Sequence, residues 1–171
     1  MFSKLKDILF NKRSGLSEGG FNPSKKRNSV DVVIRDAAGN IKFQHRTYNL
    51  RTNVGIDFVA DALSKSPQPA PANYIAVSTD VAAAAAGDTV LASELAVSGL
   101  TRALGTYTHT SFATTYTVDK TFTVTGGPHT VTKAALFNAA VAGTMVFEAL
   151  FGTSATVNGG DTLSVTWSIT I

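Results

Sequence analysis

Residues 163–171 read LSVTWSITI, a strict alternation of apolar and hydroxyl side chains. Successive residues of a β-strand point to opposite faces of a sheet, so this alternation predicts a strand with one buried face and one exposed face. The predicted buried face consists of Leu163, Val165, Trp167, Ile169 and Ile171. We therefore expect Trp167 to belong to the core and not to a ligand-binding surface.

A second strand of the same kind is predicted over residues 116–124. Its apolar face, which Lys120 interrupts, consists of Tyr116, Val118, Phe122 and Val124. Turns are expected at Gly126-Gly127-Pro128 and Gly159-Gly160-Asp161. The other strands are predicted over residues 74–77, 102–111, 130–138 and 145–151. The strand described first is predicted to extend over residues 161–171. Short strands at this spacing predict a mainly β fold, with an antiparallel β-sandwich or jelly-roll-like domain over residues 74–171.

Residues 30–66 are predicted to form a β-hairpin and one short helix. Apolar residues alternate through residues 30–48 around a turn at residues 37–40. Residues 54–65 have helical periodicity, with Asn53 as the expected N-cap. The apolar stripe of this helix comprises Val54, Phe58 and Ala62, with Val59 and Leu63 beside it. Residues 67–73 contain three prolines and predict a stiff connector.

Residues 1–29 predict an extended, basic docking arm. Apolar residues recur at helical spacing near its start, and such a short amphipathic helix needs a partner surface to be stable. A Gly-, Ser- and Pro-rich stretch with a basic run follows. We expect the following residues to bind a partner: Phe2, Leu5, Ile8, Leu9, Lys12, Arg13, Lys25, Lys26 and Arg27.

Charge is distributed unevenly along the chain. Residues 1–51 carry eleven Lys and Arg against four Asp and Glu, a net charge of +7, whereas residues 52–171 carry four against eight, a net charge of −4. The basic segment is therefore expected to dock on an acidic protein surface. Direct contact with nucleic acid is not favoured, because Phe21 is the only aromatic residue near the basic run at residues 25–27.

The sequence contains no motif that predicts catalysis or cofactor binding. It has no cysteine, phosphate-binding loop or nucleophile elbow, and we expect neither a cofactor nor a metal. Two alternatives for a metal site stay open: a site built in space from its three histidines, or Ca²⁺ at turn carboxylates, although turn capping explains the carboxylates more simply. The helix pair Asp57 and Asp61 fits a solvated helix face. The three histidines of the first metal-site alternative are His45, His109 and His129. The turn carboxylates of the second are Asp80, Asp88 and Asp161.

Transport across or into a membrane is not predicted. No apolar run reaches the roughly 18 residues of a membrane span, and residues 1–13 are too interrupted by charge for a secretory signal. We expect the chain to be made and folded in the cytoplasm.

The second half of the chain resembles a class of virion proteins of tailed bacteriophages. Their typical ending, EAGLFNA…GGTM…F…GDTLTVTWTITF, is matched by TKAALFNA (132–139), GTM (143–145), Phe151 and GDTLSVTWSIT (160–170). Their DTAL…E…R stretch is matched by DTVL (88–91), Glu94 and Arg102. Ala135 stands where Gly is common, and the likeness covers roughly residues 74–171.

The resemblance implies a structural protein of a phage particle without enzymatic activity. The first hypothesis is a capsid decoration, or cement, protein on the outer head surface. It would be a dimer or trimer whose arm binds the major capsid protein or another virion protein. The alternatives are a neck or tail component, such as a collar or fibre-base protein, and a carbohydrate- or receptor-binding sandwich. The last would use strand carboxylates such as Asp119 and Glu148.

Overall fold

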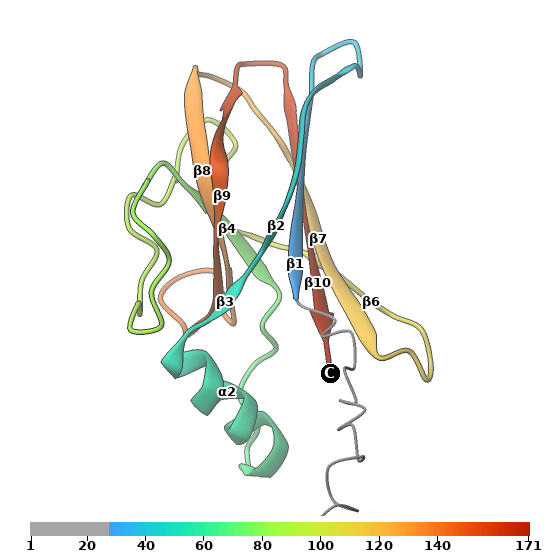
Figure 1. Ribbon diagram of the computed structural model, residues 1–171, viewed down its shortest axis with the longest axis vertical. Coiled ribbons are helices and arrows are strands. Elements are labelled where there is room, and N and C mark those ends of the chain that lie inside the picture. Colours follow the sequence, from blue (N-terminus) through green and yellow to red (C-terminus); the bar gives the residue numbers. More distant parts are fainter. Residues whose placement is uncertain (1–27) are drawn as a thin grey trace, which may run out of the picture.

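A computed structural model describes residues 28–171, which form two antiparallel five-stranded sheets packed face to face (Figure 1). The first sheet has the order β2 (Ile41–Tyr48), β1 (Ser29–Arg35), β10 (Thr162–Thr170), β7 (Thr115–Thr123) and β6 (Thr106–His109). The second has the order β3 (Leu50–Arg51), β9 (Met145–Val157), β8 (His129–Phe137), β4 (Tyr74–Ser78) and β5 (Ala103–Leu104). The predicted mainly β sandwich is confirmed.

Strand β10 is the middle strand of the first sheet. It pairs along its whole length with β7, and from Thr162 to Ser168 with β1. Its burial alternates residue by residue, as the sequence predicts. Trp167 is fully buried and meets Phe147 of the second sheet, with ring centroids 6.2 Å apart. Ile171 was expected on the same buried face, but its side chain is 75% exposed because it lies beyond Thr170, the last paired residue of the strand.

The predicted hairpin is present as β1 and β2. Its turn is held by Asp36, whose Oδ1 accepts hydrogen bonds from the backbone N–H groups of Ala38 and Asn40, both at 2.9 Å. Strand β1 also pairs with β10, which lies more than 120 residues further along the chain. The segment 30–66 therefore contributes strands β1, β2 and β3 to the same sandwich that residues 74–171 complete.

Both lateral edges of the sandwich are formed by chain segments that pass from one sheet to the other. Strand β2 leads directly into β3, and β5 leads directly into β6. The second passage occurs at Gly105, where an added Cβ would lie 2.8 Å from Val118 Cγ1 and 2.9 Å from the carbonyl oxygen of Asp119. The single strand predicted over residues 102–111 is therefore wrong in this detail, because the backbone bends at Gly105.

Helix α2 (Asn53–Ser64) lies at one end of the sandwich (Figure 1). Its N-cap is Thr52 and not Asn53: the buried Thr52 Oγ1 accepts a hydrogen bond from the N–H of Gly55 at 2.9 Å. Phe58 packs against the core as expected, whereas Leu63 is 83% exposed. The helix packs closely on the sheet at Gly55, where an added Cβ would lie 2.2 Å from the carbonyl oxygen of Val146.

The contact at Gly55 gives a direct test of this packing. Gly55→Ala is expected to lower the free energy of unfolding by about 1–3 kcal/mol, because a new methyl group meets rigid backbone. The matched control is Gly87→Ala, where an added Cβ has no atom within 4 Å. Urea denaturation of both variants checks the difference, and equal stabilities would contradict the described position of α2 on β9.

Candidate assembly surface

One end of the sandwich brings together several segments that are far apart in the sequence. We call it the arm-bearing end, defined by Asn28, helix α2, the connector 67–73, the loop 110–114 and Ile171 (Figure 1). Hydrogen bonds tie these segments together. Thr170 N donates to Asn28 Oδ1 at 2.8 Å, and Ile171 N donates to the carbonyl oxygen of Thr114 at 2.9 Å. The chain therefore enters the described domain at the same end where β10 finishes.

An apolar groove of about 470 Å³ opens at the arm-bearing end, between α2, the proline connector and the β6–β7 edge. The rings of Tyr107 and Tyr116 lie 5.5 Å apart in its wall. Burial raises the pKa of the Tyr116 hydroxyl above its ordinary value, so this group stays neutral at physiological pH. The groove is lined by Phe58, Ala62, Gln68, Pro69, Pro71, Ala72, Asn73, Tyr107 and Tyr116.

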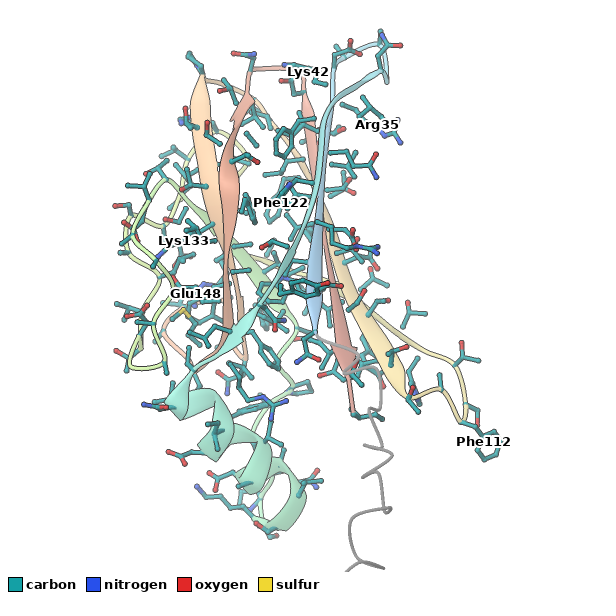
Figure 2. The ribbon with its side chains drawn as sticks, viewed as in Figure 1. Arg35, Lys42, Phe112, Phe122, Lys133 and Glu148 are labelled. Atoms are coloured by element: carbon teal, nitrogen blue, oxygen red, sulfur yellow. The ribbon has the colours of Figure 1, made fainter. Side chains whose placement is uncertain are left out.

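Phe112 stands at the tip of the loop between β6 and β7 and projects away from the domain (Figure 2). Its side chain is fully exposed, and its backbone is left-handed with φ of +64°. A large aromatic residue rarely adopts this conformation, and complete exposure gives no packing energy in return. Phe112 is therefore a candidate contact for another molecule.

The partner-binding residues predicted from the sequence all precede Asn28 and lie outside the described residues. They are Phe2, Leu5, Ile8, Leu9, Lys12, Arg13, Lys25, Lys26 and Arg27. The structure adds the groove and Phe112, which sequence reasoning missed. The available signal for Phe112 was an isolated aromatic residue in a turn rich in Ser and Thr, at residues 108–115.

A polar cluster lies on the outer face of the second sheet, beneath the long loop 79–102. Lys133 of β8 is 2% exposed, and its Nζ lies 2.9 Å from Glu148 Oε1 on β9 and 2.7 Å from Asp80 Oδ2 on the loop (Figure 2). Asp88 lines a pocket together with Asp80, Lys133 and Glu148. The ammonium group thus connects the loop to two neighbouring strands.

The charges of this cluster depend on one another. Burial disfavours the Lys133 ammonium, but its hydrogen bonds to Asp80 and Glu148 outweigh this effect and raise its pKa. Burial also raises the pKa of Glu148, an effect that Lys133 opposes. The hydrogen bond from Lys133 lowers the pKa of Asp80. Lys133 therefore remains a cation that compensates the carboxylates around it, and the cluster fastens the loop.

Arg102 fastens the other end of the same loop. Its guanidinium donates to both carboxylate oxygens of Glu94, at 3.0 and 2.6 Å, and to the carbonyl oxygen of Ala142 at 2.6 Å. It also lies over the ring of Phe137, 3.5 Å from the centroid. Glu94 and Arg102, which the sequence resemblance singled out, thus act together in holding loops against β8.

The carboxylates considered for other chemistry are separated or engaged in the fold. Asp119 lies on β7 and Glu148 on β9, which belong to opposite sheets, so they do not form an acid pair. Asp61 Oδ2 pairs with Lys65 at 2.8 Å. Asp161 Oδ2 accepts from Lys42 Nζ at 2.5 Å and from Asn158 N at 2.8 Å. Among residues 28–171, no group of three or more His, Asp or Glu side chains is arranged to hold a metal ion.

Comparisons with protein-family models, with curated proteins and with solved structures found no match to this chain. Within residues 28–171, no helix has the length and apolar character needed to cross a membrane.

The cluster around Lys133 predicts a large effect of a single substitution. Lys133→Met is expected to lower the free energy of unfolding by about 3–5 kcal/mol, because it leaves Glu148 buried without its cation. The matched control is Lys65→Met, which removes the exposed pair with Asp61 and should leave the free energy of unfolding nearly unchanged. Chemical denaturation at neutral pH measures both, and similar small losses would show that the cluster does not hold the loop.

Proposed function

We propose that this chain is a structural protein of a tailed-phage particle, and that its role is to decorate and stabilise the outer head shell. The observation that carries the proposal is the position of the residues that resemble phage virion proteins. They occupy turns and strands that determine the sandwich. Gly160 has φ of +91° beside the Asp161 turn, and Thr144 N donates to Asn138 Oδ1 at 2.7 Å. A pattern of this kind specifies a shared fold, so the specific role belongs to the segments outside it.

Two features outside this pattern support an assembly role: the basic residues 1–27 and the exposed apolar surface at the arm-bearing end. The basic residues 1–27 enter the domain at the arm-bearing end, where the neutral groove and the exposed Phe112 also lie. In the proposal, the arm docks on an acidic surface of the major capsid protein or another virion protein. A protein that binds only the assembled shell stabilises that shell by mass action. No catalytic step is part of this function.

Full-length variants test which part of the arm docks. Leu5→Asp with Ile8→Asp should abolish co-sedimentation with phage heads prepared without this protein, because the apolar stripe is interrupted. Replacing Lys25, Lys26 and Arg27 together by Gln should weaken binding and reduce its dependence on salt. The control is Lys65→Gln, an exposed lysine of α2 outside the arm. Undiminished binding of both arm variants would contradict the proposal.

The neck or tail alternative uses the same docking and differs in copy number. A head decoration protein is present in on the order of hundreds of copies per particle, and a neck or tail protein in about six or twelve. Quantitative mass spectrometry of purified particles separates the two. A carbohydrate-binding role is less well supported, because Asp119 and Glu148 lie on opposite sheets.

A further inference from the structure

Strand β6 is the exposed edge of the first sheet, and all four of its residues are exposed. The segment around it, residues 103–118, contains no Lys, Arg, Asp or Glu. The opposite edge of the same sheet differs, because β2 carries Lys42 and Arg46. Charged side chains on an edge strand prevent pairing with other chains, so β2 is guarded against edge pairing and β6 is not.

We propose that β6 pairs with β6 of a second copy of this chain, in antiparallel orientation about a two-fold axis. The first sheets of both copies would then join into one ten-stranded sheet. A neutral edge favours its own copy as the partner, because symmetry places like residues near one another and here no like charges meet. The exposed backbone groups of β6 supply the hydrogen bonds.

Sheet geometry restricts the register of this pairing. Residues directly opposite each other in an antiparallel pair point to the same face, so the symmetry axis must pass beside a residue and not between two residues. An axis beside Thr108 places Tyr107 opposite His109 of the second copy.

Three exposed apolar side chains lie in β6 or close to it in the chain. Leu104 is 54% exposed, Tyr107 57% and Phe112 fully exposed. Tyr107 also borders the apolar groove. Burial of these side chains supplies the hydrophobic energy that four residues of edge pairing alone would lack.

The pairing also positions the two arms. Ser29 lies opposite Ser168 in β10, which lies opposite Thr117 in β7. Thr117 lies opposite Thr108 in β6, so the point where the arm joins the sheet is level with the proposed axis. The two arms would join the combined sheet at points seven strand spacings, or about 34 Å, apart. Their simultaneous docking rests on the proposed function, whereas the dimer itself does not.

Light scattering coupled to gel filtration tests the dimer with the full-length chain. The wild type should be a dimer at micromolar concentration. Thr106→Lys combined with Thr108→Lys should weaken the dimer at least about tenfold, because like charges then face each other across the axis. The control Gln44→Lys places the charge on the other edge strand and should leave the dimer intact. A wild type that stays monomeric up to ~100 µM, or a Lys variant that dimerises normally, would overturn the proposal.

Disulfide cross-linking tests the register and does not depend on a destabilising change. The chain has no cysteine, so Thr108→Cys introduces a single thiol beside the proposed axis. Residues directly opposite in an antiparallel pair have Cβ atoms about 4.5–5.5 Å apart, near the distance that a disulfide bridges. Mild oxidation should give a covalent dimer with Thr108→Cys and little with Gln44→Cys. Equal cross-linking of both variants would exclude pairing through β6. Failure of the dimer would leave the arm-docking tests unaffected, so the two proposals are separable.

Discussion

The fold depends on the burial of alternate side chains of β10 between the two sheets. Every second residue from Leu163 to Ile169 is buried, and Trp167 at the centre meets Phe147 of the opposite sheet. Because β10 pairs with both β1 and β7, a shift of one residue would turn its apolar face to solvent and break two ladders at once. The register of β10 therefore determines the position of the first hairpin, and with it the place where the N-terminal segment joins the domain.

The outer face of the second sheet is organised differently. It is covered by a loop and not by another sheet, and the loop is fastened by buried ions. Lys133 connects Asp80 of the loop to Glu148, and Arg102 connects Glu94 to the carbonyl oxygen of Ala142. Removing one member of such a cluster costs more than the intact cluster contributes, because the remaining charge stays buried. These ion clusters hold the loop in the absence of any disulfide in this chain.

Sequence periodicity predicted the elements whose pattern is local. Strands β7 and β10, the hairpin and helix α2 all have an apolar period that identifies them. The sequence pattern did not predict features that tertiary contacts determine. The N-cap of the helix is the buried Thr52, and the strand predicted over residues 102–111 is bent at Gly105. Strand β9 runs to Val157, beyond the predicted 145–151, because its pairing with β8 resumes at residues 155–157 after a shift in register. The groove could not be predicted, since its walls come from residues 58–73 and 107–116, which only the folded chain brings together.

We propose that residues 28–171 fold independently and that residues 1–27 act on other molecules. A comparison of a chain of residues 28–171 with the chain of residues 1–171, by thermal unfolding and amide NMR spectra, tests this division. We expect one cooperative transition for each chain, midpoints within about 4 °C, and superimposable signals from the sandwich. An unfolded or aggregated shorter chain would contradict it, because the first 27 residues would then be part of the domain's own core.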